Sequence, residues 1–266
     1  MISVAIIVKN GEKYLRECLG ALEAFEDIVL LDNGSDDRTL EIAGRFANVK
    51  IINCEFIGFG PLKNLAADQA RNDWILSLDC DEILSPELLC EINNLGLDEK
   101  CVYRFSRRSY FKDKWIKGCG WHPDKILRLY NKKRTAFNDN LVHESVLVKP
   151  GMRAVDLKGF IRHYPYNSVD ELLDKARFYA SLYARQFRGK KESSPLKAVA
   201  RGAAAFLKGY ILRSGWRDGY EGFIISFSQG FAACMKYIKL YEINRDDDLS
   251  AADPRIEAGK DNRADR

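Results

Sequence analysis

The first hundred residues alternate between two patterns of hydrophobic and polar positions. Short apolar runs rich in valine, isoleucine and leucine predict four buried strands, at Ile2–Val8, Ile28–Leu31, Val49–Asn53 and Trp74–Leu78. Helical spacing and capping residues predict a helix after each strand, at Glu12–Leu22, Thr39–Phe46, Leu62–Arg71 and from Ser85-Pro86 to about Asn94. This alternation predicts an α/β fold with a mostly parallel sheet and helices on both faces.

The pattern changes after residue 100. Val102–Arg107 and Lys125–Tyr130 predict strands that extend the sheet in the antiparallel direction. From about Arg245 the chain is polar and mixed in charge, which predicts a disordered tail. Amphipathic C-terminal helices are expected from Ser168, from Ser194 to about Arg213, and over Gly222–Tyr241.

Charge is distributed unevenly along the 266 residues, although the net charge is only +4. Residues 1–100 hold nine Lys or Arg against nineteen Asp or Glu, whereas residues 103–134 hold eleven basic residues against two acidic ones. Residues 185–217 hold nine basic residues and one acidic residue. The two basic segments predict an anionic partner. Their aromatic residues also suit single-stranded nucleic acid, but no recognised motif accompanies them, so we expect no nucleic acid partner.

Cysteine usage and hydropathy predict a cytoplasmic protein. The seven cysteines are odd in number and form no C-x-x-C pair, which is typical of reduced thiols. The apolar run at the N-terminus is too short for a signal sequence, and no segment reaches the roughly 20 apolar residues that a spanning helix needs. Apolar faces beside basic residues in residues 195–241 predict either contact with an anionic membrane surface or helices that pack within the protein.

Two acidic residues follow the fourth predicted strand. Asp79 and Asp81 are two positions apart, so their carboxylates can point into one cleft at the carboxyl edge of the sheet, where such proteins bind ligands. Carboxylate oxygens suit Mg²⁺ or Mn²⁺, which in turn bind a diphosphate. The alternative is that Asp81 or Glu82 only solvates a turn. The position at a strand end favours the metal site.

Asp32 closes the second predicted strand and begins the loop Asp32-Asn-Gly-Ser-Asp-Asp37. Its carboxylate could accept hydrogen bonds from a nucleotide base or ribose. The alternative is an Asx-turn followed by a helix cap at Ser35 or Asp36. Taken alone, the loop favours the turn.

Four stretches of the first 95 residues belong together: Ser3–Asn10 with Glu12, Asp32–Asp37, Lys63-Asn64 and Trp74–Glu82. In combination they resemble the family-2 glycosyltransferases of GT-A fold, in which a Rossmann-like sheet binds a nucleotide-activated sugar. The resemblance implies a base contact at Asp32, a ribose or ordered-water contact at Asp79, and the metal at Asp81. Lys9 departs from the family, since many members have an aromatic residue there. The implied donor contacts are Val8, Asn10, Glu12, Asp32, Lys63, Asp79 and Cys80.

The resemblance narrows further along the chain, at Gly120–Asp124, Leu127–Tyr130, Val142–Glu144 and His163-Tyr164. These stretches look like the bacterial lipopolysaccharide core β-glucosyltransferases, which act at the cytoplasmic face of the membrane. The implied function is transfer of a hexose, glucose, from a UDP-sugar to an anionic glycolipid acceptor. We expect a nucleotide-sugar-binding half (1–100), an acceptor-binding and catalytic half (101–190), a C-terminal helical region that either contacts a membrane surface or packs within the protein (191–244), and a disordered tail (245–266).

Enzymes of this family are inverting, so a carboxylate must deprotonate the acceptor hydroxyl. We expect Glu144 to be this base, with Asp139 and then Asp124 as alternatives; otherwise Glu144 only pairs with a nearby basic residue. His163 is a candidate metal ligand beside Asp79 and Asp81, because glycosyltransferases of this fold often use a late histidine. The expected acceptor or phosphate contacts are Trp121, Arg128 and His143.

Two other functions fit part of the pattern. A polyprenyl-phosphate sugar synthase would use the basic segments for its lipid phosphate, although Val142–Glu144 argues against it. A non-catalytic module that binds a sugar nucleotide or an anionic membrane would not need acidic residues at every expected position. The inverting, metal-dependent transferase accounts for more of the sequence than either.

Overall fold

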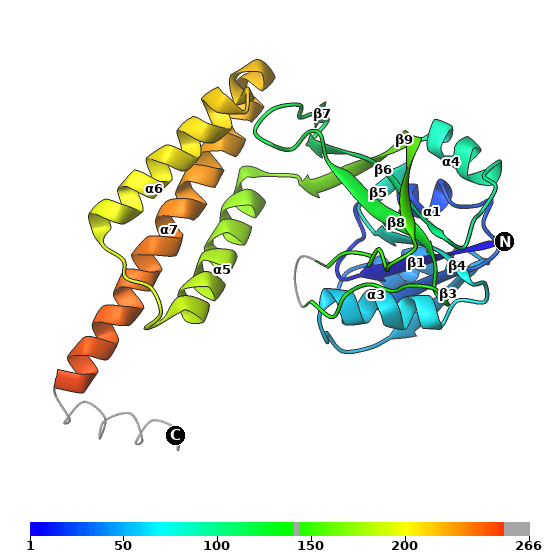
Figure 1. Ribbon diagram of the computed structural model, residues 1–266, viewed down its shortest axis with the longest axis horizontal. Coiled ribbons are helices and arrows are strands. Elements are labelled where there is room, and N and C mark those ends of the chain that lie inside the picture. Colours follow the sequence, from blue (N-terminus) through cyan, green and yellow to red (C-terminus); the bar gives the residue numbers. More distant parts are fainter. Residues whose placement is uncertain (141–143, 253–266) are drawn as a thin grey trace. The chain divides into compact units, whose positions relative to one another are not determined.

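The computed structural model describes residues 1–140 and 144–252, with side chains described up to residue 246. These residues form two compact units, drawn together in Figure 1. The first unit holds Met1–Tyr110 and Pro123–Pro165, and the second holds Phe111–His122 and the residues from Tyr166 onward. These units are defined by packing, whereas the expected division at residues 100, 190 and 244 is defined by function and stays a prediction.

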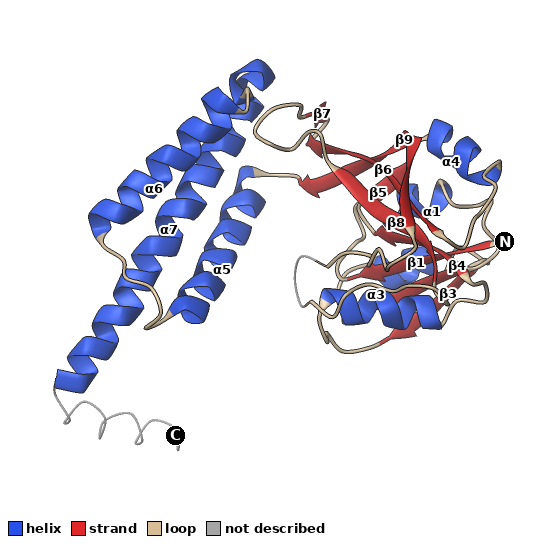
Figure 2. Ribbon diagram, viewed as in Figure 1, coloured by secondary structure: helices blue, strands red, loops and turns tan. Residues whose placement is uncertain are grey.

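The first unit is built on a mixed sheet (Figures 1 and 2). The order of its strands is β3-β2-β1-β4-β8-β6-β9-β5. Its first four strands are parallel, and they agree with the strands predicted from the sequence to within one residue. Their bounds are β1 (Ile2–Val8), β2 (Ile28–Asp32), β3 (Val49–Asn53) and β4 (Trp74–Asp79).

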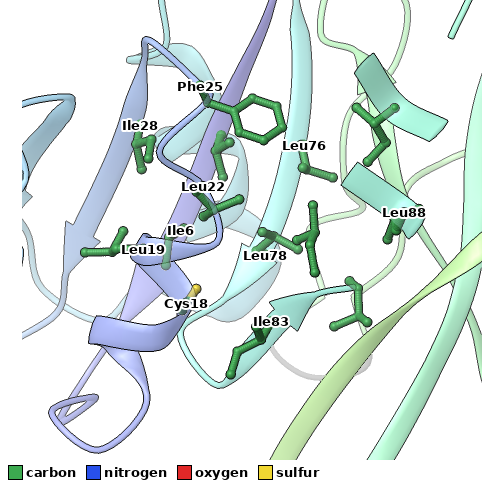
Figure 3. Close-up of a cluster of buried hydrophobic side chains, with 14 of the residues drawn as sticks. Ile6, Cys18, Leu19, Leu22, Phe25, Ile28, Leu76, Leu78, Ile83 and Leu88 are labelled. Atoms are coloured by element: carbon green, nitrogen blue, oxygen red, sulfur yellow. The ribbon is translucent and has the colours of Figure 1, made fainter. Parts of the chain in front are cut away.

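Alternate side chains of the parallel strands face opposite layers of helices, as the pleat of a strand requires. Val4 and Ile6 of β1 belong to a core cluster with α1, α2 and α4, part of which is shown in Figure 3. Ala5 and Ile7 of the same strand belong to a second cluster with α3. The α/β fold of GT-A type with helices on both faces is therefore confirmed. The helices are α1 (Leu15–Gly20), α2 (Thr39–Ala43), α3 (Phe59–Asp68) and α4 (Pro86–Asn93).

Antiparallel strands extend the sheet beyond β4, as predicted. β8 (Lys125–Asn131) pairs with β4, β6 (Cys101–Phe111) pairs with β8, and β9 (Arg153–Tyr166) pairs with β5 (Glu82–Leu84). The sequence did not predict β5 or β9. Because β5 has only three residues, its apolar pattern is too short to stand out.

The starts of α2 and α4 depend on different capping groups. Ser85 caps α4 as predicted, since its hydroxyl accepts a hydrogen bond from the Leu88 N–H at 3.2 Å. Neither Ser35 nor Asp36 caps α2, which begins after Arg38, and the Thr39 N–H instead donates to Asp37 at 2.9 Å. The expected cap was wrong because Ser35 is engaged in the loop before the helix.

The second unit is a bundle in which α7 (Gly219–Ala252) packs against both α5 (Val169–Phe187) and α6 (Pro195–Leu207) (Figure 2). The hydroxyls of Ser168 and Ser194 cap α5 and α6, as predicted. A π-helical turn (Lys208–Leu212) and a 3-10 turn (Gly215–Asp218) connect α6 to α7. The short strand β7 (Lys114–Trp115) pairs with β6.

The last helix is longer than the sequence predicted. It continues to Ala252, past the point near Arg245 where a tail was expected, and residues 253–266 lie outside the described part of the chain. Over the described residues, no helix is both long enough and apolar enough to cross a membrane.

Candidate active site

The parallel strands bring their carboxyl ends to one edge of the sheet. Val8, the last residue of β1, pairs in register with Asp32 at the end of β2. On its other side, β1 pairs with β4, and Ile7 lies opposite Asp79. Asp32 and Asp79 therefore flank the end of the central strand, as the sequence predicted.

Gly11 allows the loop after β1 to approach the residue that follows Asp79. A Cβ atom at Gly11 would lie 2.7 Å from a methyl carbon of Val8 and 3.1 Å from Cys80 Sγ. Burial raises the pKa of the Cys80 thiol, and the neighbouring carboxylate of Asp81 adds to this effect. Cys80 is thus an uncharged side chain that directly follows Asp79 and lies against the loop after β1.

Asp32 holds its own loop in a turn. Its carboxylate accepts hydrogen bonds from the N–H groups of Gly34 at 3.0 Å and Ser35 at 3.1 Å, and from the Ser35 hydroxyl. Asn10 joins this loop to the one after β1, because its side-chain oxygen accepts from the Asp36 N–H at 3.0 Å and its N–H donates to Ser35 Oγ at 2.9 Å. The predicted turn is formed, and the base contact stays a prediction.

Glu12 joins the same two loops from their exposed side. Its carboxylate accepts from the Arg38 N–H at 3.1 Å and lies 3.4 Å from Arg38 Nε. Its N–H donates to Asp37 at 3.1 Å. The loops after β1 and β2 are therefore fixed to each other before any donor binds.

Asp79 lies between two cations. Its Oδ1 is 2.9 Å from Lys63 Nζ, and its Oδ2 is 2.7 Å from Arg128 Nη2. Burial alone would raise the pKa of the Asp79 carboxyl, but the charges of Arg128 and Lys63 outweigh it and hold that pKa well below its usual range. Asp79 is therefore ionised at neutral pH.

Glu82 is a completely buried part of the same network. Its carboxylate accepts from Arg128 at 3.0 Å, from Arg107 at 3.1 Å and from the Asp79 N–H at 3.0 Å. Burial opposes ionisation of Glu82, yet the charge of Arg128 leads the effects that lower its pKa. The alternative in which Glu82 only solvates a turn is therefore excluded, because Glu82 is buried at the start of β5. Only the apolar pair Ile83-Leu84 follows Glu82, which is too short a pattern to indicate a buried strand.

Lys63 connects Asp79 to the predicted base. Its side chain is only 1% exposed, and its ammonium nitrogen lies 2.9 Å from Asp79 Oδ1 and 2.9 Å from Glu144 Oε1. Glu144 is the more open partner, since 17% of its side chain is exposed. The structure thus places Lys63, Asp79 and Glu144 together.

Helix α3 positions both Lys63 and the segment that leads to Glu144. Asn64 forms a double hydrogen bond with the backbone of Phe137, donating to its carbonyl at 3.0 Å and accepting from its N–H at 2.9 Å. Gly60 donates its N–H to the carbonyl of Asn140 at 3.1 Å. Sequence reasoning gave neither Asn64 nor Gly60 a role in the site, because each acts through a contact far away in the sequence.

Asp81 and His163 meet across the pair of strands β5 and β9. His163 Nε2 lies 3.7 Å from Asp81 Oδ2, and Nδ1 lies 3.0 Å from the hydroxyl of Ser109. Burial, with the positive charge of Arg107, lowers the pKa of His163 to about 4, so the ring is neutral at neutral pH. A neutral ring that donates Nδ1–H to Ser109 turns a lone pair toward Asp81.

An imidazole nitrogen and a carboxylate oxygen that face each other suit a divalent cation. Within the described part of the chain, however, no three His, Cys, Asp or Glu side chains gather closely enough to hold a metal ion by themselves. Both oxygens of Asp79, the other predicted ligand, already face cations. A metal held here would therefore need further ligands from water or from the substrate.

The remaining predicted contacts lie in several places. Arg128 is buried against Asp79 and Glu82, so its partners in the structure are carboxylates of the protein. Trp121 belongs to the second unit, where it stacks on a tyrosine. His143 lies outside the described residues. Of the two alternative bases, Asp124 forms an ion pair and Asp139 is exposed.

Comparisons with known proteins find several glycosyltransferases among the similar chains. An uncharacterized glycosyltransferase of Rickettsia typhi is 29% identical over 257 residues, which cover 91% of this chain and 87% of the relative. The lipopolysaccharide core biosynthesis glycosyltransferase LpsC of Rhizobium meliloti is 28% identical over 255 residues, covering 91% of this chain and 92% of LpsC. Among solved structures, S. aureus TarS 1–349 in complex with UDP-GlcNAc has a TM-score of 0.45 at 15% identity, covering 85% of this chain and 89% of that one.

The decisive match is to a family profile. The profile described as Glycosyl transferase family 2 matches residues 3–156, more than half of the chain. This range contains all the strand-end carboxylates, Lys63 and Glu144. The chain therefore belongs to glycosyltransferase family 2 and is a transferase enzyme.

Proposed function

We propose that the protein is an inverting glycosyltransferase that moves a hexose, with glucose as the first candidate, from UDP to a lipopolysaccharide core or similar anionic glycolipid. One observation carries the proposal, namely the buried ammonium of Lys63 that lies 2.9 Å from both Asp79 and Glu144. Asp79 belongs to the strand-end edge that serves the donor, whereas Glu144 comes from the half assigned to the acceptor. The extended likeness to LpsC supports this acceptor class.

The donor would lie along the edge formed by Val8, Asp32 and Asp79. The joined loops of Asn10 and Glu12 follow this edge, and Cys80 lies against the first of them at Gly11. Because these loops are fixed to each other by hydrogen bonds, little ordering would be needed when the nucleotide binds. Lys63 is almost fully enclosed, so we assign it the role of counter-ion to the two carboxylates rather than direct contact with the diphosphate.

Asp81 and His163 would hold Mg²⁺ or Mn²⁺ together with oxygens of the donor. A cation bound there would neutralise the charge that develops on the leaving diphosphate. Ser109 orients the ring of His163 for this role. Asp79, kept ionised by Lys63 and Arg128, would accept a hydrogen bond from the ribose or from an ordered water molecule.

Glu144 would act as the general base. It would take the proton of the acceptor hydroxyl as the acceptor oxygen attacks the anomeric carbon, and the bond to the diphosphate would break on the opposite face of the sugar. This single displacement inverts the anomeric centre and needs no covalent intermediate. Lys63 supplies the counter-charge for the ionised carboxylate. Trp121 and His143 remain the proposed acceptor contacts, and Arg128 is now proposed to orient Asp79.

The test is transfer from UDP-glucose to a deacylated lipopolysaccharide core, followed by analysis of the product's anomeric configuration. Glu144→Gln should lower kcat by about 10²-fold to 10⁴-fold, because the variant keeps the shape of the side chain but cannot accept the proton. Calorimetry should show UDP binding nearly unchanged.

Glu23→Gln is the matched control, since Glu23 is exposed in the same unit. Turnover of Glu144→Gln close to that of this control would refute the base assignment. A thermal-shift screen of nucleoside diphosphates with Mn²⁺ tests the donor separately. Stabilisation by a nucleoside diphosphate other than UDP would overturn the choice of uracil as the donor's nucleotide base.

A further inference from the structure

A basic pocket of about 700 Å³ lies within the second unit, where two distant segments of the chain meet. One wall comes from the loop at residues 117–122, and the other comes from residues 213–218 between α6 and α7. These are parts of the two basic segments that the sequence shows separately. The lining residues are Lys117, Gly118, Gly120, His122, Arg213, Ser214, Arg217 and Asp218.

Backbone hydrogen bonds fasten the two walls. The Cys119 N–H donates to the carbonyl of Arg213 at 2.9 Å. The carboxylate of Asp218 accepts from the N–H groups of Lys117 at 3.3 Å and Gly118 at 2.6 Å. Gln229 of α7 donates to the carbonyl of Cys119 at 2.9 Å. The pocket is thus held by the fold and does not depend on flexible surface side chains alone.

The backbone around the pocket is strained. Cys119 and Ser214 both have a φ of +56°, the left-handed region that side chains other than glycine seldom adopt. Gly120 has a φ of +78°, and a Cβ atom there would clash with the guanidinium of Arg213. Local strain of this kind persists where the surrounding structure imposes it, and it gathers at binding sites.

The charges of the pocket are largely uncompensated. In the part of the chain that the structure describes, no carboxylate forms an ion pair with Lys117, Arg213 or Arg217. The only acidic lining residue, Asp218, is buried and spends its carboxylate oxygens on backbone N–H groups. The Nδ1 atom of His122 is buried and has no hydrogen-bond partner. Three cations that line one pocket suit a phosphate group.

Apolar side chains stand exposed beside these cations. Leu212 directly precedes Arg213 and is 79% exposed, and Trp216 directly precedes Arg217 and is 54% exposed. Tyr220, at the start of α7, is 68% exposed. Aromatic and aliphatic side chains next to basic ones are typical of protein surfaces that insert into the headgroup region of a bilayer.

We propose that this pocket binds the phosphate of an anionic membrane lipid, while Leu212, Trp216 and Tyr220 enter the surrounding interface. A soluble phosphate compound offers the same charge, but it would leave these exposed apolar side chains without a partner. The site would hold the enzyme at a membrane whatever sugar it transfers. The inference therefore goes beyond the proposed reaction and can be tested without it.

The test is co-sedimentation of the full-length protein with vesicles of phosphatidylcholine that contain about one-third phosphatidylglycerol. The double variant Arg213→Gln/Arg217→Gln should bind these vesicles about tenfold more weakly than the parent protein. The control Arg201→Gln/Lys208→Gln removes the same charge from exposed positions of the same unit, and its affinity should fall by no more than about threefold. Lys117→Gln provides a second pocket variant should the double variant fail to fold by circular dichroism.

Equal losses in the pocket and control variants would overturn the proposal, because they would show attraction by overall charge. Absence of binding of the parent protein to the anionic vesicles would overturn it as well. Glycerol 3-phosphate, added as a soluble probe while the His122 ring is followed by NMR, distinguishes the source of the phosphate. A shift with this probe in a protein that ignores the vesicles would assign the pocket to a soluble ligand instead.

Discussion

Lys63 carries a buried charge whose two carboxylate partners come from distant parts of the chain. Asp79 and Glu144 each lie 2.9 Å from its nitrogen, and both carboxylates keep some contact with solvent. Burying an ammonium group costs free energy unless it is paired with an opposite charge. Asp79 and Glu144 must therefore lie close to the Lys63 nitrogen in the folded protein. The sequence indicated that Lys63 belonged to the site, but the pattern around it could not reveal which charges it compensates.

Lys63→Met should therefore affect activity more than stability alone would predict. The two carboxylates would repel each other without the ammonium between them, because Arg128 lies directly against Asp79 and Glu82, and Glu144 would lose the cation that it contacts. We expect kcat to fall at least about 10²-fold and the free energy of unfolding to fall by about 2 kcal/mol. Urea unfolding and transfer assays measure the two effects. Lys50→Met is the control, since Lys50 is exposed, and unfolding of that variant should change by less than about 0.5 kcal/mol.

Asp81→Asn tests the proposed metal site, again by changing a single residue. The amide would weaken a divalent cation shared with His163, so UDP binding should lose most of its dependence on Mn²⁺. Calorimetry of UDP with Mn²⁺ and with a chelator measures this dependence. The control is Asp156→Asn, an exposed residue paired with Arg104. Equal UDP affinity of the parent protein with and without chelator would contradict the metal assignment.

At the scale of elements, the parallel strands could be predicted from the sequence because each is an uninterrupted apolar run. β5 could not, since three residues carry no period, and its partner β9 was missed with it. This pairing is what places Glu82 opposite His163 and leaves Asp81 near the ring. The sequence thus indicated Lys63 and Arg128 as well as the carboxylates of the site, but it could not show the ion pairs that join them.

We predict that Gly60 of helix α3 positions the segment that leads to Glu144. A Cβ atom at Gly60 would clash with the carbonyl oxygen of Asn138, so Gly60→Ala should displace the segment that leads to Glu144. We expect kcat to fall about tenfold, although alanine normally favours a helix by about 0.5–1 kcal/mol over glycine. Gly20→Ala is the matched control, because a Cβ atom there meets no neighbour within 4 Å. Steady-state kinetics of both variants decide, and similar kcat values in the two would contradict the role of Gly60.

For the whole molecule, the important fact is that the second unit includes residues from the middle of the chain. Phe111, Ile116 and Cys119 are buried together with Leu172 of α5 and Ile225 of α7. The predicted boundary at residue 190 followed the extent of the family resemblance, and it left α5 in the same half as the antiparallel strands. Composition could not show that residues 111–122 belong with the helices, since that relation appears only in the packing.

Truncation after Pro165 should therefore not yield a well-behaved catalytic half. It would expose the apolar side chains of residues 111–122, so we expect binding of a hydrophobic dye and loss of solubility, with a lower midpoint of thermal unfolding. Replacing Phe111 and Ile116 with serine in the truncated chain should restore much of the solubility. A truncated protein that is as soluble as the full chain, without these replacements, would contradict this account.

The chain passes between the two units three times, and this has a consequence for inheritance. A unit joined to its neighbour by one linker can be exchanged by a single recombination event between genes. Here such an event would cut through one of the units, so an intact exchange would need several coordinated crossovers. The helical unit should therefore descend together with the sheet, and the R. typhi and R. meliloti relatives match along 91% of the chain, beyond the family profile's end at residue 156.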